Sequence, residues 1–346
     1  PFLNRLHLAV KEELPYGNNA TCSWMDTICD IFTPARQHAE APGYWKDYRK
    51  AKPLFISVYG DWEYYTQDAG IDQKEFSDPG SSERTSRQTR GDGDRRMLQQ
   101  ALNFQEAHND NLYGPCIGDA NWLMYDYNRG NAPDLETSGI MDIFRLPKFA
   151  YWFYRSQHDH GPVCFIAHHN LPESGNMVRV FSNADSIQLF RNDSLIAVQG
   201  PDIDSASLNL LHPPFTFTLP DYVPGTIKAN ALRNGTVIVS HTVSTPGKPV
   251  ALRLSADLSN KPLRGDNSDA VFVYATLIDS AGNQAHTADS LVEFTVRGNA
   301  EVIGANPVRA EAGIASILLR SGSPGRVMIK ASSEGMSEAE LMTESR

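Results

Sequence analysis

One short stretch of the chain gathers side chains that could bind a polar ligand. Trp122 is followed within seven residues by Asp126, Asn128 and Arg129. A lone tryptophan is compatible with ordinary core packing. A carboxylate, an amide and a guanidinium beside it are costly to bury without partners. The cluster therefore favours a binding site that combines an aromatic surface with hydrogen-bonding groups.

A second candidate pair, Asp61 and Trp62, follows residues 54–59, which have the clearest strand pattern in this part of the chain. Asp61 could bind the ligand directly or orient a neighbouring group. Residues 81–96 carry five arginines among three acidic residues, which is typical of a solvated loop. The alternative is a lid that contacts the ligand or a neighbouring domain.

The histidines favour no metal site. They occur as His158-Asp159-His160 and His168-His169, without the supporting acidic or cysteine spacing of a metal motif. The sequence also lacks a Gly-x-Ser-x-Gly elbow, a P-loop and a dinucleotide fingerprint. We therefore expect neither a metal nor a cofactor.

The charge balance limits the kinds of partner that the protein is suited to bind. The chain has 31 Lys and Arg against 41 Asp and Glu, a net charge of −10. An acidic protein is poorly suited to bind a nucleic-acid backbone or an anionic membrane. No apolar run reaches the ~18 residues of a membrane span. Aromatic residues make up 10% of the chain, enough for stacking surfaces as well as for a core.

The pattern of the chain changes near residue 160. Before it, apolar runs alternate with amphipathic stretches, which predicts a parallel sheet with crossover helices. After it, short alternating strands are separated by turn signals such as Asn234-Gly235, which predicts antiparallel sandwiches. The last dozen residues are polar and are expected to be frayed. We predict strands at 27–32, 54–59, 116–127, 178–182, 186–190, 226–232, 237–243, 271–278 and 291–296, and helices at 2–10, 34–50, 97–108 and 146–157.

Several motifs resemble glycoside hydrolase family 2, the β-galactosidase family. Residues 55–62 (FISVYGDW) resemble the seventh strand of its barrel, and residues 118–130 (GDANWLMYDYNRG) resemble the eighth. The likeness continues into the last barrel helix, the following sandwich and a final Ig-like module. The segments that carry it are 138–142 (SGIMD), 145–148 (RLPK), 180–185 (VFSNAD) and 310–315 (AEAGIA).

The resemblance implies a fold of the α/β plus all-β type. It comprises the C-terminal part of a TIM barrel over 1–160, a β-sandwich over 161–248 and an Ig-like β-sandwich over 249–346. A complete barrel needs about 250 residues. The first four strands would precede Pro1, and half a barrel leaves a parallel sheet edge open. We therefore expect a fragment of a longer polypeptide, or a chain completed by a complementing one.

The resemblance also implies a reaction. Retaining glycosidases use two carboxyl groups, an acid/base and a nucleophile. By the family pattern the acid/base glutamate would lie upstream of Pro1, and the nucleophile would stand at Val58, which has no lone pair to attack with. Three interpretations remain open: an inactivating substitution (natural or engineered), a misassigned residue, or replacement by another carboxyl, of which Glu63 and Asp61 are nearest.

In the family pattern, Trp122 matches an aromatic floor beneath the sugar, whose C–H face is apolar. Asp61, Trp62, Asp126, Asn128 and Arg129 are the other expected substrate-binding residues. The implied activity is hydrolysis of terminal β-galactosides or related β-glycosides. The alternative is a carbohydrate-binding or scaffold chain that has lost its nucleophile.

Three further expectations follow from the resemblance and the sequence. By analogy the protein is periplasmic or secreted, although the four cysteines fit the cytoplasm as well. A homo-oligomer is possible. A third, weaker interpretation makes 161–346 an independent assembly module.

Overall fold

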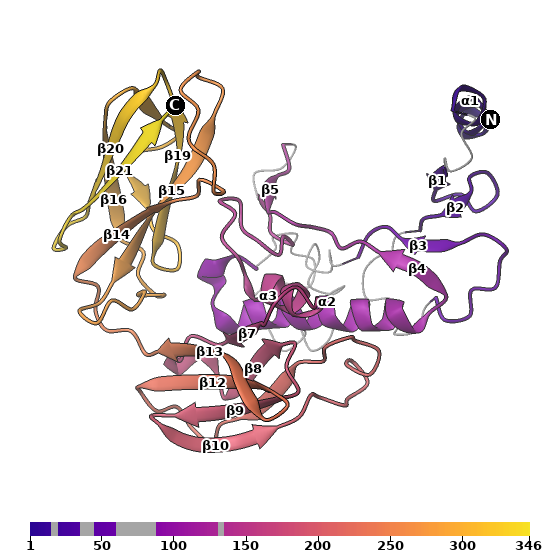
Figure 1. Cartoon of the computed structure of the whole chain (residues 1–346), viewed down its shortest axis with the longest axis horizontal. Helices are drawn as coiled ribbons and strands as arrows, with labels where there is room; N and C mark the ends of the chain where they lie inside the picture. The colour runs from indigo at the N-terminus through magenta and orange to yellow at the C-terminus, as the bar shows by residue number, and fades with distance from the viewer. Residues whose placement is uncertain (15–19, 35–44, 60–87, 131–134) are drawn as a thin grey trace. The chain divides into compact units, whose positions relative to one another are not determined.

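The computed structural model describes residues 1–346 except 15–19, 35–44, 60–87 and 131–134. The chain divides into two compact units (Figure 1). Unit 1 comprises residues 1–168, 176–220 and 228–242. Unit 2 comprises 169–175, 221–227 and 243–346. The domain boundaries that we inferred from the sequence stay predictions.

Unit 1 begins with a mixed α/β region. Its parallel sheet has the order β1-β2-β3-β4, and the parallel pairing expected from the sequence is confirmed. Two helices, α2 and α3, form the core beside it, with α2 the long helix that crosses the centre of Figure 1. The elements are α1 Phe2–Glu13, β1 Cys22–Ser23, β2 Ile31–Phe32, β3 Leu54–Ile56, α2 Asp94–Tyr113, β4 Cys116–Asp119, β5 Tyr127–Asn128, β6 Leu135–Glu136 and α3 Phe149–Ser156.

Several predicted elements here were too long. Only Ile31 and Phe32 of the strand expected at 27–32 are extended, because 26–30 form turns and bends. Of the helix expected at 34–50, residues 35–44 lie outside the described part and 45–47 form a turn. The strand expected at 116–127 ends at Asp119, after which the chain forms the loop that carries Trp122.

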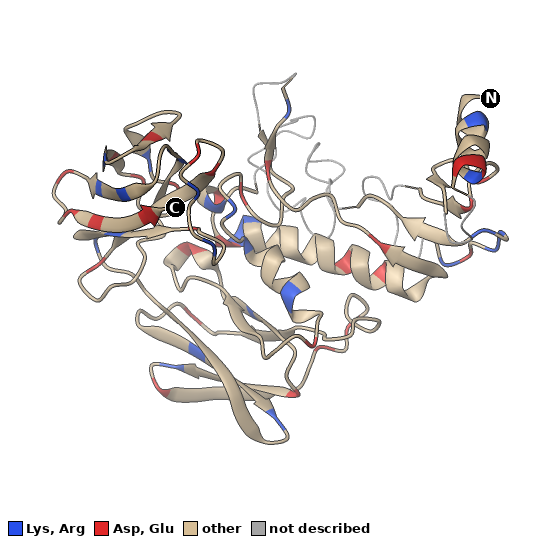
Figure 2. Cartoon of the chain, turned by 45° about the horizontal axis from the view of Figure 1, so that its top comes forward, with Lys and Arg blue, Asp and Glu red and all other residues tan. Residues whose placement is uncertain are grey.

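Helix α2 is buried almost all round. Of its 20 residues 15 are buried, among them many amides and carboxyls. Its first turn carries Asp94, which the helix dipole favours, but its last turn has no basic residue, and Figure 2 shows acidic residues toward that end. The helix is therefore stabilised by packing and by hydrogen bonds of its polar side chains to surrounding segments.

The remainder of unit 1 is antiparallel. Two sheets have the orders β11-β8-β7 and β10-β9-β12-β13. At the turn between β12 and β13, Asn234 and Gly235 both have positive φ, as the predicted hairpin requires. The strands are β7 Cys164–Ala167, β8 Met177–Ser182, β9 Ser186–Arg191, β10 Ser194–Gln199, β11 Phe215–Thr218, β12 Thr226–Arg233 and β13 Thr236–Ser244.

Helix α3 joins this antiparallel part to the α/β core. Phe153 packs edge-on against Phe181 of β8, with ring centroids 5.9 Å apart, and Trp152 stacks on Phe165 of β7 at 4.6 Å. These rings belong to one continuous core. Residues 161–346 expressed alone would therefore expose aromatic surface that α3 covers here.

Unit 2 contains a second antiparallel sandwich. Its two sheets, β14-β15-β19-β17 and β18-β16-β20-β21, enclose one apolar core. The expectation of a frayed C-terminus was wrong, because β21 pairs with β20 along its whole length. The strands are β14 Ala251–Ala256, β15 Ala270–Ile278, β16 Leu291–Arg297, β17 Ala300–Ile303, β18 Val308–Arg309, β19 Ile314–Ser321, β20 Gly325–Ser332 and β21 Ala339–Ser345.

No helix in the described part of the chain has the length and apolar character needed to cross a membrane.

Asp279 organises one end of unit 2. Its carboxyl accepts hydrogen bonds from the backbone N–H groups of Gly247 (2.8 Å), Ala281 (2.9 Å) and Asn283 (2.9 Å). These bonds, that from Gly247 foremost, lower the pKa of Asp279 to about 2. The ionised carboxyl therefore closes the turn after β15 and holds the chain segment that leads into β14.

This depressed pKa predicts a pH-dependent stability. An unfolded aspartate titrates near pH ~3.9, so the contribution of Asp279 is present above that pH and is lost as the pH falls towards about 2. We expect Asp279→Asn to flatten the fall in stability between about pH 4 and 2, measured by hydrogen exchange of the β14 and β15 amides. Asp289→Asn, at a largely exposed carboxyl, should keep the wild-type slope.

Candidate functional site

The carboxyl ends of β3 and β4 are joined directly. Beyond the paired strands, the backbone N–H of Trp122 donates to the carbonyl oxygen of Tyr59 at 2.6 Å. The Trp122–Leu123 peptide bond is cis. The Trp122 side chain remains 38% exposed, so it is not a core residue and its ring is available to a ligand. Substrate binding by Trp122 stays a prediction.

Tyr59 is fixed on the helical side of the sheet. Its side chain is buried, packs against Phe104 of α2 and receives a hydrogen bond of 2.8 Å from the hydroxyl of Tyr154 on α3. Burial raises the pKa of both tyrosines well above the usual range, so both stay protonated. Val58, which precedes Tyr59 beyond the end of β3, is half-buried.

The loop after Trp122 is held by backbone pairing to a second segment. The N–H of Ile140 donates to the carbonyl of Leu123, and the N–H of Met141 to that of Met124, each at 3.0 Å. The side-chain amide of Gln100 on α2 donates to the carbonyls of Thr137 (3.2 Å) and Gly139 (3.1 Å). Helix α2 therefore positions residues 137–141, and these position the loop that carries Trp122.

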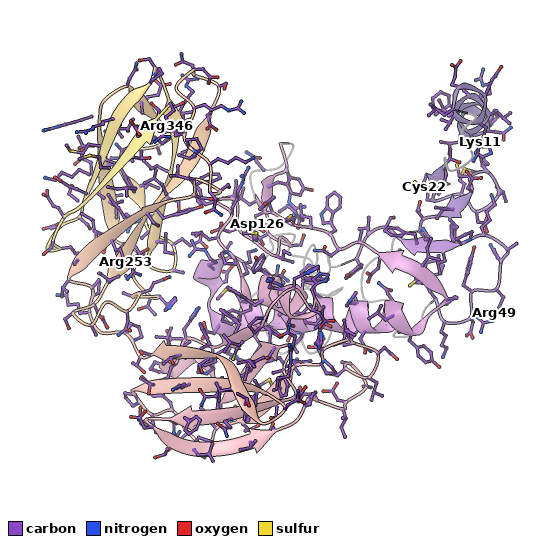
Figure 3. The ribbon with its side chains drawn as sticks, viewed as in Figure 1. Lys11, Cys22, Arg49, Asp126, Arg253 and Arg346 are labelled. Atoms are coloured by element: carbon purple, nitrogen blue, oxygen red, sulfur yellow. The ribbon has the colours of Figure 1, made fainter. Side chains whose placement is uncertain are left out.

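Asp126 lies inside this arrangement. Figure 3 labels it just before β5. Its Oδ1 accepts a hydrogen bond from Lys148 Nζ at 2.8 Å and another from the N–H of Gly139 at 2.9 Å. The side chains are almost fully buried, Lys148 at 0% and Asp126 at 3% exposure. Burial raises the pKa of Asp126 to about 7, an increase that the ammonium of Lys148 opposes. Asp126 thus links Lys148 to the backbone of Gly139, and the sugar contact that we predicted for it stays a prediction.

Arg129 and Asn128 differ in exposure. The guanidinium of Arg129 is buried against Glu136, with Nη2 and Oε2 2.7 Å apart. Asn128 is exposed on β5, and its Oδ1 accepts the N–H of Gly130 at 3.0 Å. Asn128 is thus the more accessible of the two. Substrate binding by either residue stays a prediction.

Several other residues expected in or near the site fall in the part of the chain that the structure does not describe. Asp61, Trp62 and Glu63 lie outside the described residues. Residues 81–87 also do, but 88–96 are described, and the side chain of Arg90 is not solvated. Its Nε donates to Asp142 Oδ2 at 2.7 Å in a buried pair.

The histidine motifs noted in the sequence contact protein groups. Asp159 pairs with His212 at 2.9 Å, and the His158 and His160 rings lie 6.1 Å apart. Within the described segments, no group of three or more His, Cys, Asp or Glu residues could hold a metal ion.

Sequence reasoning missed the residues that position the loop. Gln100, Glu136, Gly139 and Lys148 were assigned no role, although 138–142 and 145–148 belong to the motifs noted in the sequence. Gln100 and Lys148 act through partners at least eleven residues away, and Gly139 acts through the close approach of two backbones, which local spacing does not reveal. Glu136 pairs with Arg129, seven residues earlier in the chain.

Comparison with protein families identifies two regions. Residues 252–342 match the model described as "Glycoside hydrolase family 2 C-terminal domain 5". Residues 176–239 match a "Domain of unknown function (DUF4982)".

Individual relatives extend the similarity. The chain is 35% identical over 253 residues to a β-galactosidase of Thermoanaerobacter pseudethanolicus, covering 66% of this chain and 34% of that protein. It is 31% identical over 220 residues to the β-galactosidase BoGH2A of Bacteroides ovatus, covering 59% and 25%. The chain thus spans about a third or less of these relatives.

A solved structure shares the fold. A β-glycosidase from Bacteroides vulgatus superposes with a TM-score of 0.72 at 17% identity, over 99% of this chain and 49% of that one. The mixed α/β part with its parallel sheet and the antiparallel parts that follow therefore match parts of known glycosidase structures.

The close approach at Gly139 yields a first prediction for the site. A Cβ at this position would lie 2.5 Å from the carbonyl oxygen of Met141 and 2.6 Å from Asp126 Oδ1. Gly139→Ala should therefore destabilise unit 1 by about 2 kcal/mol or more in urea unfolding. Gly114→Ala is the control, because its added Cβ meets nothing closer than 3.5 Å. An equal, small effect of both substitutions would contradict the packing argument.

The buried pair of Lys148 and Asp126 yields a second prediction for the site. Lys148→Met removes the donor to the buried Asp126 carboxyl and to the carbonyl of Thr137, and should cost about 1–3 kcal/mol of unfolding free energy. Lys148→Met combined with Asp126→Asn should cost less than the two single changes added together, because the second change removes the carboxyl that the first leaves without its donor. Urea unfolding of the four proteins of this cycle measures the coupling. Strict additivity would show that the two groups do not interact.

Proposed function

We propose that this chain, a β-galactosidase-like relative of the family 2 glycoside hydrolases, contributes part of the sugar site of a retaining glycosidase. The proposed substrates are terminal β-galactosides or related β-glycosides. The reaction displaces the leaving group at the anomeric carbon by a carboxylate, and water then releases the sugar.

The observation that carries the proposal is the exposed indole of Trp122 at the carboxyl ends of the parallel strands. Ligands of parallel α/β sheets bind at this end of the strands. A pyranose presents an apolar C–H face and a rim of hydroxyls. The indole covers the apolar face, while polar groups nearby, of which Asn128 is exposed, satisfy hydroxyls.

Val58 limits what the chain can do by itself. Displacement needs a nucleophilic carboxylate about 5–5.5 Å from the acid/base carboxyl. Position 58 precedes Tyr59, whose carbonyl accepts the backbone N–H of Trp122, which supports a place for it beside the proposed sugar site. A valine there neither attacks the anomeric carbon nor stabilises its positive charge. We therefore assign this chain the sugar-binding part of the site, without its carboxyl pair.

The parallel sheet supports a further part of the proposal. Within the described residues, β1 and β4 each have a single neighbour in that sheet, and Ile117 of β4 is 62% exposed. Parallel sheets in known folds are covered or closed into barrels. We propose that further polypeptide, in the same or a complementing chain, completes a TIM barrel and supplies the acid/base carboxyl.

The second candidate function is a carbohydrate-binding or scaffold role without catalysis. Val58 is the specific observation in its favour, because the platform for the sugar is kept while the nucleophile's position is aliphatic. Sugar binding by the full-length protein with no turnover even in Val58→Glu would support this alternative.

Restoring a carboxyl provides the test. In the full-length protein, Val58→Glu should raise the turnover of a chromogenic β-galactoside by on the order of a thousand-fold or more, because the attacking group returns. Val58→Gln is the matched control, since its side chain has the same size but does not act as a nucleophile, and it should leave turnover unchanged.

Two results would count against the proposal. Turnover by the unchanged protein at the rate of Val58→Glu would show that another carboxyl serves as the nucleophile. If Val58→Glu gave no turnover and the protein bound no β-galactoside, position 58 would not be part of a glycosidase site.

A further inference from the structure

The short β5–β6 hairpin lies beside Trp122. Tyr127 pairs with Glu136 and Asn128 with Leu135 in antiparallel register. Glu136 fixes the base of the hairpin, because its carboxylate accepts a 2.6 Å hydrogen bond from the hydroxyl of Ser138 and pairs with Arg129 at 2.7 Å. All three of these anchoring side chains are largely buried. The backbone that carries Tyr127 is therefore held in place by charged and polar contacts.

The rings of Tyr127 and Trp122 meet edge to face. Their centroids are 6.1 Å apart and their planes are inclined by 78°. Tyr127 is 36% exposed and Trp122 is 38% exposed, so the pair lies at the surface instead of in a core. This arrangement is a favoured geometry for two aromatic rings and is worth more than the area it buries.

The backbone contacts of Trp122 leave the orientation of its indole undetermined. The hydrogen bond to Tyr59 fixes the main chain, but the indole can still rotate about its side-chain torsions. A half-exposed ring that samples several rotamers would lose entropy each time a sugar stacked on it. The contact with Tyr127 restricts that rotation, and the anchored hairpin keeps Tyr127 itself in place.

We propose that Tyr127 is a positioning residue for carbohydrate recognition: its ring, presented by the anchored β5–β6 hairpin, holds the Trp122 indole in the plane on which a sugar stacks. This inference rests on the proposed role of Trp122 as a sugar platform. It adds a residue for which the sequence alone gave no role.

The test compares four variants of the full-length protein for binding of methyl β-thiogalactoside by calorimetry. Tyr127→Leu keeps apolar bulk but loses the ring, and should weaken binding by about 3- to 10-fold, the range expected for an aromatic pair. Tyr127→Phe keeps the ring and should bind within about two-fold of the unchanged protein. Leu135→Ala alters the partner strand of the same hairpin without touching the ring pair, and should also bind normally. Trp122→Ala removes the platform and should abolish measurable binding.

A second measurement reports on the indole directly. With 5-fluorotryptophan incorporated, the ¹⁹F resonance of residue 122 is identified by its loss in Trp122→Ala. Tyr127→Leu should shift or broaden that resonance, whereas Tyr127→Phe should leave it in place. This result does not depend on whether any sugar binds.

The outcomes separate the inference from the proposed function. If Trp122→Ala binds the thiogalactoside as well as the unchanged protein, or if the unchanged protein does not bind it, the proposed function fails, while the ¹⁹F signal still decides the positioning role. The inference is overturned if Tyr127→Leu leaves both affinity and resonance unchanged. It is also overturned if Tyr127→Phe is as weak as Tyr127→Leu, which would indicate a hydroxyl contact, or if Leu135→Ala has the same effect.

Discussion

The buried contact between Lys148 and Asp126 is the constraint on which the candidate site depends. The ammonium donates to the carboxylate and to the carbonyl of Thr137, both at 2.8 Å, and it has no access to solvent. Two charges out of water are tolerated only when their geometry satisfies them. The contact therefore ties the start of α3 to the end of the Trp122 loop and to the segment before Gly139. The position of the Trp122 main chain follows from this fixed loop.

Buried polar side chains of helix α2 likewise bind surrounding segments of unit 1. Toward the site, Gln100 binds the carbonyls of Thr137 and Gly139. On another face, Gln105 donates to Ser207 and accepts from Arg179 of β8, each at 3.0 Å. A buried amide without partners would be costly, so these bonds select one arrangement of the surrounding segments. The helix thus links the loop that carries Trp122 to the antiparallel sheets through directional contacts as well as through its apolar core.

The fold could be predicted from the sequence wherever one periodicity extends over a whole element. The alternating run at 186–190 became β9, whose buried residues alternate, because burial of one face selects the same period in sequence and structure. The runs at 178–182 and 97–108 became β8 and most of α2, although nearly all residues of β8 and most of those of α2 are buried. The prediction was wrong where tertiary contacts decide. The polar C-terminus forms β21 because the edge of β20 offers backbone partners, and strand pairing does not need apolar side chains on both faces.

For the site, the sequence by itself determined which chemical groups are present: an indole followed by a carboxylate, an amide and a guanidinium, and a valine at the position where the family resemblance places a nucleophile. Only the tertiary structure decided how each is used. Asp126 and Arg129 are buried against Lys148 and Glu136, whereas Trp122 and Asn128 remain accessible. The physical reason is that a charged group's role depends on its solvation and its partner. Lys148 is 22 residues from Asp126 in the chain, and folding alone brings them together.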